Sequence, residues 1–221
     1  MKRLAIAGLA LVCAATSANA QLKSVYSSNR MEISAVAGYM WGGSAYFASA
    51  GTNPGGNFEI QDAFMWGADL AFRGGRHSWV ELTYRRQDTQ LHFIPNLAAS
   101  PTGNVALATN MIHIGGRQDF VNHSKFTPYI RGSLGATVFD NKGAGKGSST
   151  DFSLSIGGGF TFMLPNNRVG IRANLQGWFS FVPSNQVGVY CDPFFPYYCY
   201  ATTTSQTVSQ GEVSGALVFR F

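Results

Sequence analysis

The stretch that decides the fold is residues 205–221, SQTVSQGEVSGALVFRF. From Val213 to Phe221 every second residue is apolar or glycine, and the positions between them carry a mixed set that includes Glu212 and Arg220. A period of two residues is that of a β-strand with one apolar face. Such a strand fits a soluble β-sandwich or a membrane-spanning β-barrel, so the rest of the chain has to separate the two.

The first twenty residues have the pattern of a secretory signal peptide. Two basic residues precede an apolar run over residues 4–13, and small residues follow as far as Ala20. We expect cleavage after Ala20, which makes residues 1–20 the signal peptide and residues 21–221 a single domain. The apolar run is too short for a membrane-spanning helix, which needs about 20 residues. Cys13 is not preceded by a small residue, which argues against a lipoprotein.

Charge and cysteine content narrow the class of protein. The chain has 16 Lys and Arg against 11 Asp and Glu, and removal of the signal peptide takes two of the basic residues away. This mild excess is not a nucleic-acid-binding signature. Cys191 and Cys199 remain after export, and an oxidising compartment favours a disulfide between them. No later segment resembles a membrane-spanning helix, so insertion into a membrane would require a closed barrel.

Seven earlier segments share the two-residue period. We expect strands over residues 31–41, 60–73, 78–87, 104–117, 126–139, 152–162 and 169–181, followed by the last strand. Between them, long Gly-, Ser-, Asn- and Pro-rich loops at residues 42–58, 88–103, 140–150 and 183–204 alternate with short turns. Short periplasmic turns and longer extracellular loops are typical of outer-membrane barrels. In the least regular of these segments, the fourth, we expect Ile112 and Ile114 outward and His113 and Arg117 inward.

Two segments carry a family resemblance. In residues 126–139, FTPYIRGSLGATVF, a Pro-Tyr pair followed by glycine-spaced small residues resembles the middle strands of the OmpA-like and OmpX-like small barrels. The last strand resembles theirs too, and in that family the final aromatic residues, here Phe219 and Phe221, are part of the signal read by the barrel-insertion machinery. The resemblance implies an all-β, eight-stranded antiparallel up-and-down transmembrane β-barrel. It further implies a monomer in the bacterial outer membrane, in contact with lipid and lipopolysaccharide.

Eight charged residues have the parity of the inner face. They are Glu32, Asp69, Glu81, Arg85, Arg117, Arg131, Arg172 and Glu212. An eight-stranded barrel has an interior just wide enough for side chains to fill, and unpaired charges there are costly. We therefore expect a paired polar plug, with a charged ion path as the alternative. Trp178 also has inward parity, near the outer mouth. Aromatic residues near strand ends predict interfacial girdles: Trp41, Trp79, Phe139, Phe162, Phe181 and Phe219.

The fourth long loop is the most distinctive binding candidate. Prolines stiffen it, and its aromatic residues are Tyr190, Phe194, Phe195, Tyr197, Tyr198 and Tyr200. Rigid aromatic side chains in a crosslinked loop suit contact with an extracellular protein or glycan. The alternative is that they fold onto the rim or the lipid headgroups.

For catalysis, the sequence offers little. Barrels that deacylate outer-leaflet lipids resemble one another in a His-x-Ser pair on a late strand, and this chain has no histidine after His123. We expect no cofactor or metal. The function that the sequence favours most is that of a non-enzymatic structural or surface-interaction protein. A narrow pore is the second candidate, and a lipid-modifying enzyme is the third.

Overall fold

The structure is a computed structural model that describes residues 30–47, 56–95, 103–120, 126–142, 147–165, 168–182, 188–191, 199–202 and 206–221. The strands are β1 (Met31–Trp41), β2 (Ser44–Phe47), β3 (Gly56–Ile60), β4 (Ala63–Arg73), β5 (Ser78–Pro95), β6 (Gly103–Asp119), β7 (Phe126–Asn141), β8 (Gly147–Met163), β9 (Val169–Val182), β10 (Gly188–Cys191), β11 (Cys199–Thr202) and β12 (Gln206–Arg220). Of β10 and β11, only the backbone is described. Within these ranges no helix has the length and apolar character needed to cross a membrane.

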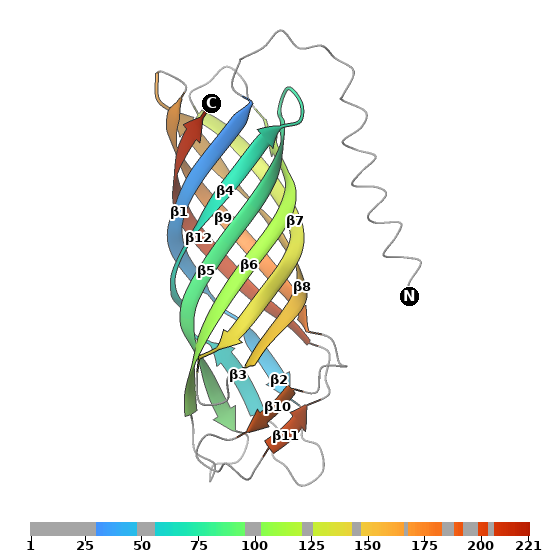
Figure 1. Cartoon of the computed structure of the whole chain (residues 1–221). Helices are drawn as coiled ribbons and strands as arrows, with labels where there is room; N and C mark the ends of the chain where they lie inside the picture. The colour runs from blue at the N-terminus through green and yellow to red at the C-terminus, as the bar shows by residue number, and fades with distance from the viewer. Residues whose placement is uncertain are drawn as a thin grey trace, which may run out of the picture.

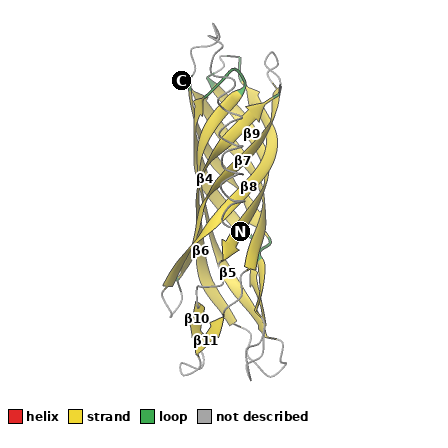
Figure 2. Cartoon of the chain, turned by 90° about the vertical axis from the view of Figure 1, so that its right-hand side faces the viewer, coloured by secondary structure: helices red, strands yellow, loops and turns green. Residues whose placement is uncertain are grey.

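The wall of the molecule is a closed antiparallel barrel (Figure 1). Neighbours around it follow the order β1, β4, β5, β6, β7, β8, β9 and β12. The last strand closes the ring on the first, with Ile33 opposite Phe219 and Trp41 opposite Gly211. The predicted eight-stranded barrel is therefore confirmed, and Figure 2 shows the same tilted strands from the side.

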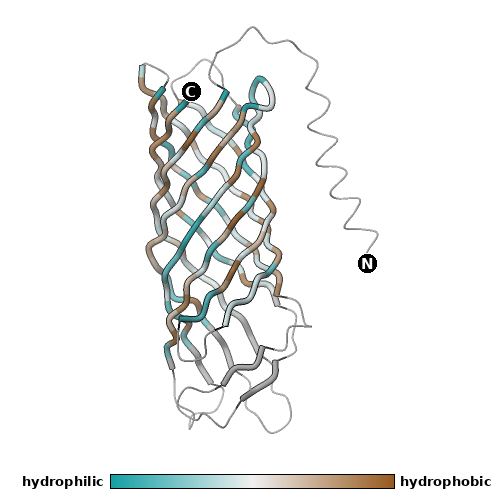
Figure 3. Tube along the Cα trace, viewed as in Figure 1, coloured by the Kyte–Doolittle hydropathy of each residue, from teal (hydrophilic) through white to brown (hydrophobic). Residues whose placement is uncertain are grey.

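The two faces of the wall have opposite character. On the outside, Phe64 is 61% exposed and Ile156 is 66% exposed, whereas the inward Asp69 and Arg85 are buried. Colouring by hydropathy shows the resulting alternation along each strand (Figure 3). A soluble sandwich would bury its apolar face and wet the polar one. This arrangement is the reverse, as in a barrel whose outer surface contacts lipid.

The two ends of the barrel differ. One end, here called the turn end, carries the short β4–β5 turn, the ends of β6, β8 and β12 and the start of β1 (Figure 1). The opposite end, here called the loop end, carries β2, β3, β10 and β11. At the turn end the backbone N–H of Arg30 donates to the carbonyl of Phe221 at 2.7 Å, so both ends of the described chain are held together there.

The predicted long loops were too long, because the strands continue past the apolar band. The expected loop 42–58 contains β2 and most of β3, which pair with each other. Gly42 and Gly43 have φ angles of 79° and 115°, a backbone conformation that favours glycine. They allow the chain to turn from β1 into β2.

The predicted bounds of the other three long loops were wrong in the same way. β5 runs on to Pro95, with His92 opposite Asn104 of β6, and β8 begins at Gly147, opposite Asn141. In both cases the backbone ladder continues although the sequence has lost its alternation. The fourth long loop contains the β10–β11 hairpin.

The irregular fourth strand adopts the predicted orientation. Ile112 and Ile114 are 52% and 56% exposed on the lipid face, while His113 and Arg117 point inward and are buried. Gly135 lies directly opposite His113. A Cβ at Gly135 would come within 2.9 Å of the His113 ring and 2.1 Å of the Ile112 carbonyl. The glycine thus provides the space that the inward imidazole occupies.

Candidate functional site

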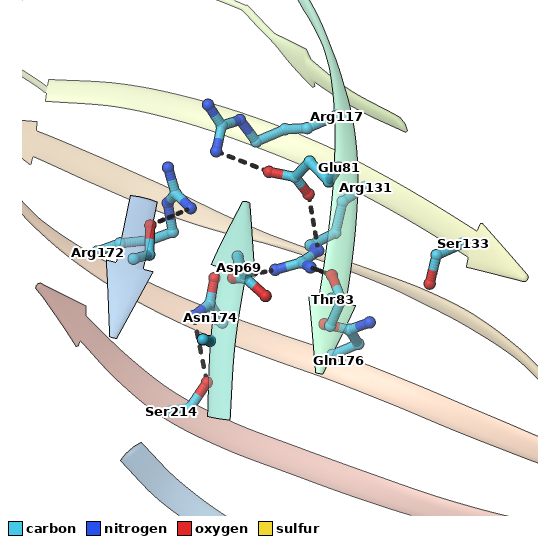
Figure 4. A network of polar contacts seen from close by, with 12 residues as sticks. Asp69, Glu81, Thr83, Arg117, Arg131, Ser133, Arg172, Asn174, Gln176 and Ser214 are labelled. Atoms are coloured by element: carbon cyan, nitrogen blue, oxygen red, sulfur yellow. Dashed lines mark hydrogen bonds and ion pairs between the residues drawn. The ribbon is translucent and has the colours of Figure 1, made fainter. Parts of the chain in front are cut away.

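The barrel interior is the best-defined candidate site. All eight charged residues predicted to face inward do so, all are buried, and each belongs to at least one ion pair. Figure 4 shows part of this network, with side chains from opposite walls meeting in the lumen. The structure therefore brings the whole predicted set together.

Arg117 is the centre of the part of the ion-pair network that lies nearer the turn end. Its Nη1 lies 2.8 Å from Oε1 of Glu32 and 2.8 Å from Oε1 of Glu81, and its Nε lies 3.1 Å from Oδ1 of Asp119. The guanidinium also stacks over Trp79, 5.0 Å from the ring centroid. Three carboxylates and an aromatic face thus share one fully buried cation.

Glu32 is the complementary hub. Besides Arg117, it accepts hydrogen bonds from Arg172 and from Nε of Arg220, the latter at 2.8 Å. Tyr129 packs between the bases, with the Arg172 guanidinium carbon 5.4 Å from its ring centroid. The Tyr129 hydroxyl also donates to Asn174. The network therefore extends over the wall from β1 to β9.

A second set of pairs continues toward the middle of the barrel. Arg131 lies 3.3 Å from Glu81 and 3.4 Å from Asp69, and it donates to Thr83 at 2.7 Å. Arg85 holds the other side of Asp69 with two hydrogen bonds, at 2.7 and 3.2 Å. Because Asp69 and Glu81 are each shared between two arginines, the buried charges compensate one another, as buried ions require.

Trp178, which has the predicted inward orientation, links the charges to an aromatic contact. It is fully buried, and its indole N–H donates to Oε2 of Glu212 at 2.8 Å. Glu212 in turn accepts from Nε of Arg85 at 3.4 Å. The indole meets the His113 ring edge to face, with centroids 4.8 Å apart. Trp178 is thus part of the lumen filling.

An apolar layer that was not predicted from the sequence lies beside Trp178. Met40, Met65 and Met111 are at most 1% exposed and form one cluster with Trp178. A second cluster contains Ile60, Leu107 and Val208. The signal that could have found the methionines was their inward parity, since Met40 and Met65 alternate with exposed aromatic residues. Unbranched methionine side chains fill irregular interior gaps well.

His113 is the one histidine inside the barrel wall among the described residues. Its Nε2 lies 2.7 Å from Oγ of Ser153 and its Nδ1 lies 3.1 Å from Oγ of Ser133. A catalytic Ser-His pair needs a base that is oriented by a third group and open to substrate. Here both ring nitrogens face hydroxyl groups, and the side chain is fully buried. The geometry is that of a packed polar contact.

Two aromatic residues expected in the interfacial girdles were wrongly placed. Trp79 is 3% exposed and its N–H donates to Asp119 at 3.0 Å inside the lumen, while Phe139 packs against the second apolar cluster. Both occupy inward positions of their strands, so parity decides their direction. Trp41, Phe162, Phe181 and Phe219 are exposed on the lipid face.

The structure describes only some of the residues of the binding site predicted in the fourth long loop. Cys191 lies directly opposite Cys199, and Tyr190 lies opposite Tyr200, in the β10–β11 hairpin. Phe194, Phe195, Tyr197 and Tyr198 lie outside the described residues. At the other end, Phe219 and Phe221 are exposed, at 41% and 63%.

Asp151 supplies a contrast within the same lumen. It is 1% exposed, accepts a hydrogen bond from Ser149 at 3.3 Å, and has no ion pair with any side chain that the structure describes. We expect Asp151→Asn to leave the free energy of unfolding unchanged or to raise it, because a buried charge without a counter-ion opposes folding. The matched change Asp69→Asn should lower it by about 3–5 kcal/mol, since Arg85 and Arg131 each lose one of their two buried carboxylate partners.

Urea titration of the folded barrel in detergent micelles measures both variants on one scale. A loss of several kcal/mol in Asp151→Asn would show that this carboxylate has a counter-ion after all.

Solved structures of other proteins are similar to this barrel. The crystal structure of Neisserial surface protein A (NspA) matches with a TM-score of 0.56 at 15% identity, covering 86% of this chain and 97% of that one. The crystal structure of the outer membrane protein OprG from Pseudomonas aeruginosa matches with a TM-score of 0.57 at 12% identity, covering 87% of this chain and 97% of that one. The chain has the fold of a small outer-membrane β-barrel. No protein-family model matches it, and no curated protein sequence does either.

At these identities the likeness extends to the fold alone. The predicted resemblance to small outer-membrane barrels is confirmed at that level.

Proposed function

We propose that the protein is a non-enzymatic, monomeric outer-membrane protein whose barrel is a closed anchor for the segments at its loop end. The observation that carries this proposal is the filled lumen. Arg85, Arg117 and Glu212 are at most 2% exposed and fully paired, and the methionine cluster adds an apolar layer. A lumen filled in this way leaves the outer surface as the place for interaction.

The proposal includes a route to the membrane. Residues 1–20 direct export and are removed, and the turn end faces the periplasm because short turns lie on that side in outer-membrane barrels. Phe219 and Phe221 serve as the signal for the barrel-insertion machinery. The wall then contacts lipid and, at the loop end, lipopolysaccharide.

A narrow pore is the second proposal, favoured by the charged residues in the lumen. In that case the paired side chains line an ion path, and the layer of Met40, Met65 and Met111 is its barrier. Ions cross an apolar constriction only when it becomes hydrated, so a pore requires these side chains to move.

The hairpin at the loop end is expected to carry a disulfide. Residues directly opposite in an antiparallel pair have Cα atoms about 4.5–5.5 Å apart, which lies inside the range of roughly 4.4–6.8 Å for disulfides. With the chain lacking residues 1–20 and folded in air, we expect no reaction of Cys191 or Cys199 with maleimide before reduction and reaction of both after it. In Cys191→Ser, the remaining thiol should react without reductant. Labelling of both wild-type cysteines without reductant would contradict the bond.

The proposed interaction surface is the aromatic segment between the two cysteines. A variant with Phe194, Phe195, Tyr197 and Tyr198 all changed to Ser tests it on whole cells, with adhesion to host-cell or glycan-coated surfaces as the readout. Leu97→Ser, in the connection between β5 and β6, is the control. We expect adhesion to fall in the quadruple variant only. Unchanged adhesion, at equal surface expression, would reject the aromatic segment as the binding surface.

A further inference from the structure

Asp151 of β8 is a buried carboxylate whose charge is not balanced by any side chain that the structure describes. It is 1% exposed. Its Oδ2 accepts a hydrogen bond from Ser149 at 3.3 Å, and its Oδ1 has no hydrogen-bond partner among the described residues. An ionised carboxylate can only accept hydrogen bonds, and burying it without a counter-charge is costly. Its ionised form therefore requires a positive partner from outside the described residues.

Asp151 lies nearer the loop end than Trp178 does. β8 runs from the loop end to the turn end (Figure 1), and Asp151 is four positions closer to the loop end than Ser155, which lies opposite Trp178. The buried polar residues around it on β7, β8 and β9 are neutral, namely Thr137, Ser153 and Ser180. The charge of Asp151 is thus set among hydroxyl groups.

These hydroxyl groups offer oxygen atoms to Asp151 and no hydrogen atoms. Thr137 lies directly opposite Asp151, so the Cβ atoms of the two are about 4.5–5.5 Å apart. Ser180 donates to Thr137 at 2.9 Å, and Thr137 donates to Ser153 at 2.9 Å. Since the hydroxyl hydrogens of Ser180 and Thr137 are used in this chain, neither can neutralise the carboxylate by donating to it. What remains on both hydroxyl groups is oxygen lone pairs.

A carboxylate beside hydroxyl oxygens has the chemistry of a site for a small, hard cation. Such cations prefer oxygen ligands. Calcium sites gather about 6–8 oxygen atoms, with carboxylates prominent among them. Asp151 supplies a single carboxylate and a single negative charge. The charge of the site therefore suits a monovalent cation better than a divalent one.

We propose that Asp151, with the hydroxyl oxygens of Thr137 and Ser180, binds a monovalent metal cation of the sodium class inside the lumen. The cation supplies the counter-charge that the described side chains do not. Because Trp178 lies between this site and the turn end, binding does not require ions to cross the barrel. The inference goes beyond the proposed anchor function, and the sequence analysis did not expect a metal site because neither the burial of Asp151 nor its missing partner is visible in the sequence.

The test compares thermal unfolding of the folded barrel, in micelles of one uncharged detergent, in sodium chloride and in choline chloride of equal concentration. Choline keeps the ionic strength and is too large for a site among packed side chains. We expect sodium to raise the unfolding midpoint of the wild type by several degrees. The rise should grow with the logarithm of the sodium concentration, as for any ligand that binds only the folded state.

Two aspartate variants assign the effect. The rise should vanish in Asp151→Asn and remain in the matched control Asp88→Asn, whose carboxylate is half exposed and paired with Arg86 and Lys142. In choline chloride, Asp151→Asn should unfold at or above the wild-type temperature, because the uncompensated charge is gone. The urea comparison of Asp151→Asn with Asp69→Asn therefore belongs in choline chloride.

Three outcomes would overturn the proposal: no sodium-dependent rise in the wild type, an equal rise in Asp151→Asn, or a rise that appears only in Lys146→Gln, which would assign the counter-charge to that lysine. Sodium-23 NMR provides a second measurement, because the wild type should broaden the sodium signal more than Asp151→Asn does. Conductance is recorded separately. Current through the folded barrel would reject the closed anchor, whereas the sodium dependence of unfolding decides the cation site.

Discussion

Replacing Arg117 with Gln is expected to lower the free energy of unfolding of the barrel by about 3–5 kcal/mol, the usual effect of breaking a buried ion pair by removing one partner. Arg117 contacts Glu32, Glu81 and Asp119 at once. Its removal leaves an excess of negative charge in a part of the lumen closed to water. A neutral amide cannot supply the missing counter-charge.

The matched control is Arg86→Gln. Arg86 also forms an ion pair with an aspartate, Asp88, at 2.9 Å, but both side chains are partly exposed on the outer wall. Exposed pairs contribute about 0–1 kcal/mol. Equilibrium unfolding in urea, from micelles of one detergent, should therefore separate the two variants by several kcal/mol. Equal small losses would mean that the lumen is hydrated and that its ion pairs are screened.

Replacing Trp178 with Ala is expected to lower the free energy of unfolding by about 3–5 kcal/mol, as for other large aromatic residues removed from a packed interior. The side chain fills space beside Met111 and the His113 ring. Its loss creates a cavity and leaves one oxygen of Glu212 without the indole donor.

A second variant separates these two contributions. Trp178→Phe keeps most of the ring volume and removes the hydrogen bond to Glu212, so we expect a loss of about 1–3 kcal/mol. The same urea titration applies. If Trp178→Ala unfolded at the wild-type urea concentration, the lumen would not be packed at this level.

Alternation along the chain made most of the fold predictable. Once Val80 and Leu82 are assigned to lipid, Glu81 and Thr83 must point inward, and the same step orients His113 between Ile112 and Ile114. This is why all eight lumen charges could be named from the sequence. Where the parity was not applied, as for Trp79, the prediction failed.

The partners of these charges could not be predicted. Arg117 meets Glu32, 85 positions away in the chain, because the stagger of the strands around a barrel decides which inward positions share a level. The sequence contains no direct record of that stagger. The extent of β5 and β8 was missed for a related reason, since above the apolar band the backbone ladder continues while the side chains no longer alternate.

The central claim is that the lumen is closed by paired charges and an apolar layer. Single-channel current across a planar bilayer, recorded from barrels whose folding and insertion are shown by heat-dependent gel mobility, tests it most directly. We expect no conductance steps from the wild-type protein. Steady, repeatable steps from folded, inserted barrels would contradict the account and favour the narrow pore.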